Sequence, residues 1–306
     1  MNSEDPVIQK LVALGEKHDS LRAVILTSSR CNPNAYQDIF SDYDAMVFFT
    51  DPAPFLESDS WFEALGPVLA VYRDEFLNPD YTSYMRMAFY EDGTKIDFSV
   101  NYAARLVSIC AEPSLPEWLD VGYEVLVDKD GLTSSLATPT FKAYIPAIPT
   151  ETEYHTLVNE FWTESIYVAK QIWRNDLMPV KFNLDHIMKL EYVRKMIEWS
   201  IEIDRGWNWK PGAYGKGLRK ALDPDTYAEL TATYVGGDID EHWDALSRTT
   251  ALFRKLALEV GEALGYEYLH DLDRRVTIYH QTVRKLDRQA TSREELARLL
   301  KESLRE

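Results

Sequence analysis

Small polar residues and acids gather in one stretch near the amino terminus, "TSSRCNPNAYQDIFSDYDAMVFF" (residues 27–49). An apolar run ends at Ser28 and Ser29, and the next apolar run begins with Asp42 and Asp44. Residues two apart in a strand face the same side, so both carboxylates can hold a metal ion together. Magnesium prefers such oxygen ligands. The stretch predicts a site for metal and phosphate; ordinary polar chemistry at a turn is the alternative.

A third acid lies inside the apolar run "TKIDFSV" (residues 94–100). Alternation places Ile96 and Phe98 on one face of the expected strand and Asp97 on the other. Aspartate is disfavoured in strands, so its presence there needs a reason. Two-metal sites for phosphoryl-type transfer commonly use a further acid. We therefore predict Asp97 as the third metal ligand, with a plain surface position as the alternative.

The serines and the arginine that follows them are suited to phosphate groups. Small polar residues at the end of a strand expose backbone N–H groups, which bind phosphate together with a serine hydroxyl. Arg30 adds a fixed positive charge. We predict that Ser28, Ser29 and Arg30 bind a nucleotide; for the serine pair a simple helix cap is the alternative.

The elements that must position these residues change character along the chain. The first part has β-rich runs with two helical ones, and the turn "EDG" predicts a hairpin. The expected strands cover residues 22–29, 44–50, 68–76, 81–90, 94–100 and 123–129, and the expected helices cover 5–18 and 61–65. A proline-containing segment, residues 137–154, predicts a linker.

The second part has helical periodicity over residues 151–205, with a break near Pro179, and over 242–265. A glycine-rich patch at 210–222 predicts a turn, and Ser292 with Glu295 predicts the start of a last charged helix. The fold class is therefore α+β. We predict a mixed sheet with helices in residues 1–145 and a helical bundle domain in residues 146–306.

Composition and charge narrow the class of protein. The formal net charge is -17 and the sequence pI is about 4.8, which disfavours nucleic acid as a partner and suits a small cation. The sequence has no apolar run of about 18 residues, and its amino terminus, "MNSEDPVIQK", does not resemble a signal peptide. Two cysteines give no disulfide framework. We expect a cytoplasmic protein without a membrane partner, as a monomer or homodimer.

Several segments together resemble a known family. "SSRCNPNAYQDIFSDYDAMVFF" is similar to the family segment "GSR-x-N…F-x-DYD", and "YEDGTKIDFSV" is similar to "FEDGNKLDL". "VLVDKDG", "NEFW", "YVAK", "LDH", "GKGLRK" and "ALFRK" recur in family order. The chain thus resembles the aminoglycoside 6-adenylyltransferases (streptomycin adenylyltransferases), which are polymerase-β-like nucleotidyltransferases. It departs from them at Ser28, where the family generally has glycine, a residue that lets phosphate approach closely.

The resemblance implies a reaction. It implies transfer of AMP from ATP to a hydroxyl of a cationic, streptomycin-like aminoglycoside, with release of pyrophosphate. Asp42, Asp44 and Asp97 would hold two Mg²⁺ ions, and the site would lie in a cleft between the domains. The alternatives are another small hydroxylated acceptor or nucleotide donor, and a catalytically weak relative that only binds a nucleotide.

The resemblance also gives roles to residues of the second domain. Asp185 in "FNLDHIMKL" would be the general base or an acid that binds the acceptor, and capping of the following helix is the alternative. Lys170 and Lys216 would contact the triphosphate of ATP. The alternative is that Lys170 is a solvated lysine on a helix surface and Lys216 a lysine at a helix end.

Overall fold

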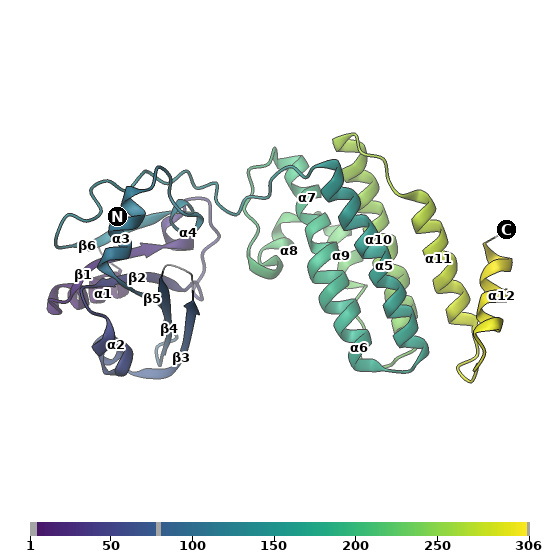
Figure 1. Ribbon diagram of the computed structural model, residues 1–306, viewed down its shortest axis with the longest axis horizontal. Coiled ribbons are helices and arrows are strands. Elements are labelled where there is room, and N and C mark those ends of the chain that lie inside the picture. Colours follow the sequence, from purple (N-terminus) through teal and green to yellow (C-terminus); the bar gives the residue numbers. More distant parts are fainter. Residues whose placement is uncertain (1–4, 78–80, 305–306) are drawn as a thin grey trace. The chain divides into compact units, whose positions relative to one another are not determined.

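The computed structural model describes residues 5–77 and 81–304 (Figure 1). The chain divides into two units, Met1–Tyr144 and Ile145–Glu306, whereas the sequence-based prediction placed the boundary after residue 145. Each unit has a hydrophobic core of its own. Within the described residues no helix combines the length and the apolar character that crossing a membrane requires.

A mixed sheet forms the centre of the amino-terminal unit, with six strands among the described residues in the order β3-β4-β5-β2-β1-β6. The strands are β1 (Leu21–Thr27), β2 (Tyr43–Phe49), β3 (Val68–Leu77), β4 (Thr82–Tyr90), β5 (Lys95–Tyr102) and β6 (Tyr123–Asp128). Neighbours are antiparallel except β2 and β5, which are parallel. The predicted strands and the hairpin at "EDG" are confirmed, with ends that coincide or differ by at most two residues.

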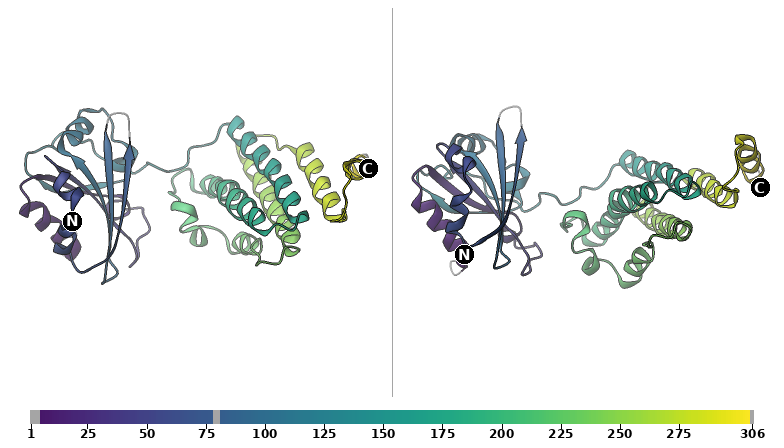
Figure 2. Two further views of the ribbon diagram at one scale, coloured as in Figure 1. Left: turned by 60° about the horizontal axis from the view of Figure 1, so that its bottom comes forward. Right: turned by 90° about the horizontal axis from the view of Figure 1, so that it is seen from below.

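Helices cover both faces of this sheet (Figure 2). On one face lie α1 (Pro6–Lys17), α2 (Ala53–Glu57) and the 3₁₀ turn η2 (Ser60–Ala64). Phe98 of β5 packs edge-on against Trp61 there, with 4.8 Å between ring centroids. On the other face lie α3 (Ala103–Ala111) and α4 (Glu117–Asp120), which bury Leu106 and Leu119 against Phe48. The sequence did not predict α3 and α4, whereas α1 and the turn at 61–65 are confirmed.

The carboxyl-terminal unit consists of helices packed around aromatic side chains. Its elements are α5 (Glu151–Trp173), α6 (Leu177–Lys181), the π-helix η3 (Phe182–Val193), α7 (Arg194–Arg205), the 3₁₀ turn η4 (Ala213–Gly215), α8 (Leu218–Ala221), α9 (Pro224–Thr231), α10 (Glu241–Leu264), α11 (His270–Lys285) and α12 (Arg293–Ser303). Phe161 of α5 stacks on Phe253 of α10, with 3.6 Å between ring centroids. This core holds the helices together by burial of apolar surface.

Two helix boundaries differ from the prediction, and a third agrees with it. The break expected near Pro179 lies earlier, at residues 174–176. Pro179 itself falls in the first turn of α6, where the missing N–H of a proline costs no helix hydrogen bond. The linker ends at Thr150, which forms a capping box with Glu153, so its last residues belong to α5. Ser292 caps α12 as predicted but accepts from the N–H of Glu294.

Candidate active site

Three acids of the amino-terminal unit come together as the sequence predicted. Asp44 of β2 and Asp97 of β5 are register partners in the parallel pair of strands. Asp42 lies two residues before Asp44, next to the start of β2. Strand alternation turns both side chains of this pair toward the same face. The edge of the sheet therefore carries three carboxylates from two strands.

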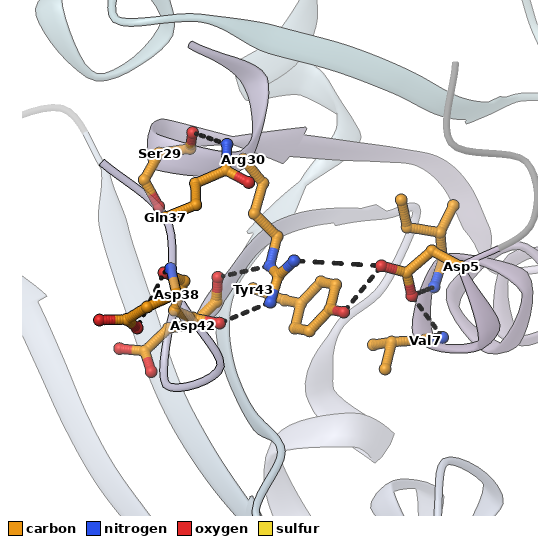
Figure 3. Close-up of polar contacts among 10 residues, drawn as sticks. Asp5, Val7, Ser29, Arg30, Gln37, Asp38, Asp42 and Tyr43 are labelled. Carbon is orange, nitrogen blue, oxygen red and sulfur yellow. Dashed lines mark hydrogen bonds and ion pairs between the residues drawn. The ribbon is translucent and has the colours of Figure 1, made fainter. Parts of the chain in front are cut away.

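Tyr43, between the two acids, points the other way and anchors the start of β2. It is 8% exposed, and its hydroxyl donates to Asp5 Oδ2 at 2.8 Å (Figure 3). Asp5 also caps α1 by accepting from the N–H of Val7 at 2.8 Å. Burial and the bond to Asp5 raise the pKa of Tyr43 to about 12. The alternation predicted for Asp42 and Asp44 is thus fixed by a buried tyrosine on the opposite face.

The environment of Asp44 disfavours a negative charge. Burial raises the pKa of Asp44 to about 6, and the charges of Asp97 and Asp42 add to this effect. A hydrogen bond from the Ser28 side chain and the charge of Lys95 oppose it. Crowded carboxylates in a half-buried site gain much from a bound cation. The electrostatics therefore favour a cation at this edge.

Lys95 supplies such a cation within the chain. Its Nζ lies 2.7 Å from Asp42 Oδ2 and 2.8 Å from Asp97 Oδ2. Burial opposes the charge of Lys95, but the two carboxylates outweigh it and raise the lysine pKa. We gave this residue no role from sequence, although alternation along β5 places it beside Asp97. Lys95 is thus the counter-ion of two predicted metal ligands.

The donor chemistry of the acids fits a magnesium ion. Carboxylate oxygens are its preferred ligands. Asp97 Oδ1 is buried and has no hydrogen-bond partner, so it is free to accept a ligand. Among the described residues, no group of three or more His, Cys, Asp or Glu side chains has an arrangement that could hold a metal ion. Binding of metal by all three acids would therefore require Lys95 Nζ to move from between Asp42 and Asp97.

Ser28 begins the 3₁₀ turn η1 (Ser28–Cys31) in a left-handed backbone conformation, with φ 67°. Its N–H donates to Gly122 O at 3.1 Å, and its side chain hydrogen-bonds to Asp44. A non-glycine residue in the left-handed backbone conformation costs about 1 kcal/mol of conformational free energy. The backbone at Ser28 is thus one that favours glycine, the residue that the resemblance implies at this position. The serine hydroxyl adds a link from the turn to the acids.

Gly122 holds this turn from the far end of the unit's sequence. Its φ is 128°, and a Cβ at Gly122 would lie 2.6 Å from Cys31 O. Nδ2 of the buried Asn32 donates to Val121 O at 2.8 Å. Only a residue without a side chain allows so close a packing. Sequence reasoning missed Gly122, since nothing in its local sequence connects it to the turn.

Arg30 orders the loop that carries Asp42 (Figure 3). Its Nε donates to Asp42 O at 3.0 Å and its Nη2 to Ser41 O at 2.6 Å. The guanidinium lies over the ring of Tyr43, 3.5 Å from the centroid, and Nη1 is 4.0 Å from Asp5. These bonds fix the backbone before β2. Contact of Arg30 with a phosphate stays a prediction.

Ser29 contributes its backbone to the same loop. The carbonyl oxygen of Ser29 accepts from Gln37 Nε2 at 2.7 Å, as Figure 3 shows. This bond ties η1 to the segment that leads to Asp42. Binding of phosphate by the Ser29 hydroxyl stays a prediction.

Asp185, in the carboxyl-terminal unit, lies on the π-helix η3 between two lysines. Lys181 Nζ is 2.6 Å from its Oδ2, and the nearly completely buried Lys189 Nζ is 2.7 Å from its Oδ1. Burial favours the neutral acid, but the two lysines outweigh it and lower the pKa of Asp185. A π-helix is rare and is frequent at functional sites. The sequence predicted a helix here but not its wider turn.

The other two predicted residues of this unit lie at helix ends. Lys170 is in the last turn of α5, with its Nζ 5.1 Å from the ring centroid of Tyr167. Lys216 is exposed and follows η4, where its backbone bonds to Gly212 and Ala213 close a turn. The turn predicted for the glycine-rich patch is thus present at residues 212–216, whereas Leu218–Ala221 of the same patch forms α8. Contact of either lysine with a triphosphate stays a prediction.

A mixed sheet that presents three carboxylates beside a tight turn after its first strand defines a nucleotidyltransferase domain. The family model described as "Streptomycin adenylyltransferase" matches residues 1–283, so the chain belongs to this family of enzymes. A Bacillus subtilis aminoglycoside 6-adenylyltransferase is 30% identical over 287 residues, which is 92% of this chain and 98% of that protein. The enzyme of that name from Staphylococcus aureus is 28% identical over 272 residues, covering 88% and 94%.

A solved structure is also similar to this chain. The crystal structure of an aminoglycoside 6-adenyltransferase from Bacillus subtilis has 26% sequence identity and a TM-score of 0.46. The match covers 92% of this chain and 97% of that one.

Proposed function

We propose that the protein transfers AMP from ATP to a hydroxyl of a streptomycin-like aminoglycoside and releases pyrophosphate, with Mg²⁺ as cofactor. The main observation in support of this proposal is that Asp42, Asp44 and Asp97 lie close together at one edge of the sheet. Membership of the family and the names of the similar enzymes support the substrates. The net charge of -17 supports a cationic acceptor.

In this reaction the acceptor oxygen attacks the α-phosphorus of ATP, and the bond to the leaving pyrophosphate breaks. Asp42 and Asp44 would hold two magnesium ions, and Asp97 would hold the catalytic one of the pair. When bound, magnesium supplies positive charge for the triphosphate and the leaving group. Ser29 would bind a phosphate through its hydroxyl, while Arg30 would keep Asp42 in position through the loop carbonyls.

Asp185 would serve the acceptor in one of two ways, as a base for the hydroxyl proton or as an acid that binds a cationic group. Its ion pairs with Lys181 and Lys189 lower its pKa, which makes a carboxylate a weaker base. Lys170 and Lys216 would meet the triphosphate.

The remaining properties follow from the chemistry of the chain. We propose a cytoplasmic enzyme that acts as a monomer or homodimer and binds no nucleic acid, since its acidic balance opposes a phosphate backbone. The first alternative is that the acceptor is another small hydroxylated molecule in place of a streptomycin-like aminoglycoside. A catalytically weak nucleotide-binding relative is the second candidate, and the left-handed Ser28 in place of glycine is the observation that favours it.

Pyrophosphate release with ATP and Mg²⁺, measured with and without streptomycin, tests the proposal. The variants are Asp44→Asn and, as a matched control, Asp51→Asn, which changes an exposed acid just beyond the other end of β2. We expect release that needs streptomycin, persists in the control and is lost in Asp44→Asn. Nucleotide binding without release would favour the weak relative. Release with a different acceptor alone would overturn the streptomycin assignment.

A further inference from the structure

A cavity of about 770 Å³ opens in the amino-terminal unit, away from the acids. The start of β4, the end of β5, α3 and the segment before α4 surround it, and its walls include Tyr81, Tyr84, Tyr102, Arg105, Ser108 and Trp118. Tyr102 lies five residues beyond Asp97 on β5, about 17 Å along the strand. Binding sites for small molecules have volumes in this range. The cavity is therefore large enough for a ligand and separate from the three carboxylates.

Arg105 brings a positive charge to this cavity, whose lining also includes the acid Glu112. Among the described residues, none of the acidic side chains lies within ion-pair distance of its guanidinium, although the chain has 50 acids against 33 lysines and arginines. Burial lowers the pKa of Arg105, and the only opposing influence comes from Tyr81. A partly buried cation normally has a partner. The cavity thus presents a guanidinium that forms no ion pair with the lining carboxylate of Glu112.

The guanidinium is held in a fixed orientation. It lies over the ring of Tyr81 at 3.7 Å from the centroid, with the Trp118 ring 5.5 Å away. Its Nη1 donates to Oδ1 of Asn101, which is 1% exposed. Asn101 Nδ2 in turn donates to Ser99 O at 2.9 Å and to Ser99 Oγ at 3.0 Å. An arginine oriented in this way loses little freedom when a ligand binds.

We infer that this cavity is a second ligand site and that it takes a small planar organic anion. The acid group of the ligand would pair with Arg105, since a guanidinium matches the two oxygens of a carboxylate or a phosphate. The ring of the ligand would pack on the aromatic walls, among them Tyr84, Tyr102 and Trp118. The shared chemistry is an oxyanion on a flat ring, from either an aromatic acid or an aromatic phosphate.

Calorimetric titration with four probes tests the ligand chemistry: benzoate, phenyl phosphate, the neutral isostere benzamide and inorganic phosphate. We expect at least one ring anion to bind about tenfold more tightly than benzamide and inorganic phosphate, because only it uses both the charge and the walls. A preference between benzoate and phenyl phosphate identifies the acid group. Equal binding of benzamide, or no binding of any probe at millimolar concentration, overturns the inference.

Variants of the full chain test the residue. Arg105→Gln should weaken binding of the ring anion about tenfold, and Arg105→Lys, which keeps the charge but not the planar fork, should weaken it less. Arg22→Gln is the matched control, because Arg22 is an arginine of the same unit already paired with Asp130. Asp44→Asn should bind the probe as the wild type does. Unchanged binding in Arg105→Gln, or loss of binding in Asp44→Asn, contradicts a separate site built on Arg105.

Discussion

Asp44 and Asp97 lie side by side as register partners on the parallel strands β2 and β5, although they are 53 positions apart in sequence. The pairing places two carboxylates on adjacent strands at one edge of the sheet, and Asp42 joins them from the loop. Each of the neighbouring acids raises the pKa of Asp44. The ionised form of Asp44 is therefore disfavoured, which we call the electrostatic stress of the site, and a bound cation would relieve it.

The first consequence concerns stability without metal. The raised pKa of Asp44, about 6, corresponds to about 3 kcal/mol of unfavourable free energy for the charged form at pH 7.5. Asp44→Asn removes this charge, so in the presence of EDTA we expect the variant to be more stable by up to about 3 kcal/mol. Urea unfolding of both proteins measures the difference. A destabilised Asp44→Asn variant would show that the carboxylate is not under stress.

The second consequence concerns Lys95, which neutralises Asp42 and Asp97. Lys95→Met leaves the three acids without their internal cation, so the metal-free protein should melt at a lower temperature, with a loss of about 1 kcal/mol or more. Affinity for Mg²⁺ should rise, because the ion no longer competes with the ammonium group. Thermal melts with EDTA and calorimetric titration with Mg²⁺ measure the two effects. Weaker binding of Mg²⁺ by Lys95→Met would contradict the competition.

The third consequence concerns the left-handed backbone at Ser28. Ser28→Gly and Ser28→Ala both lose the hydroxyl that bonds to Asp44, but only glycine adopts a φ of 67° without strain. Ser28→Gly should therefore be more stable than Ser28→Ala by about 1 kcal/mol. The comparison isolates the backbone term, since the lost hydrogen bond is the same in both variants. Equal unfolding free energies would exclude strain at this position.

A pH dependence is expected in the carboxyl-terminal unit. Burial lowers the pKa of His280 to about 4, even though Ser165 and Asp273 favour its charged form. The unfolded histidine takes up a proton below its ordinary pKa of 6.5, whereas the folded one does so only near pH 4. Stability is therefore complete above about pH 6.5 and falls as the pH drops toward 4, by about 3 kcal/mol from this group.

The variant His280→Gln isolates this effect. It should flatten the loss of stability between pH 6.5 and pH 4, whatever its stability at neutral pH. His155→Gln is the control, because His155 is only partly buried on α5 and bonds to Glu267 O. Denaturant unfolding at several pH values gives the slopes. The same slope in His280→Gln and in the wild type would show that His280 is not buried in its neutral form.

The acids could be predicted from sequence because strand alternation is a local property. The apolar runs around Asp44 and Asp97 defined β2 and β5, and the spacing of Asp42 and Asp44 gave their common face. The bridge made by Lys95 depends on which strands are neighbours, and the left-handed Ser28 depends on Gly122, far along the chain. Such contacts are set by topology and not by any local pattern.

Helices with mixed faces were the hardest elements to predict. The segment of α11 is rich in charged residues, and the apolar residues among its buried side chains are only Val276 and Val283, so few apolar residues mark its inner face. The π-helix η3 has the composition of an ordinary helix, so nothing in its sequence indicates the wider turn. Tertiary packing overrides local propensity in both segments.

The most direct test of the central claim is mass spectrometry of streptomycin after incubation with the protein, ATP and Mg²⁺. We predict an acceptor heavier by one adenylyl group (AMP less one water) with the wild type and with Asp51→Asn. With Asp44→Asn, or with EDTA in place of Mg²⁺, the acceptor should remain unmodified. An AMP adduct formed equally well by Asp44→Asn would contradict the assignment of the reaction to the three carboxylates.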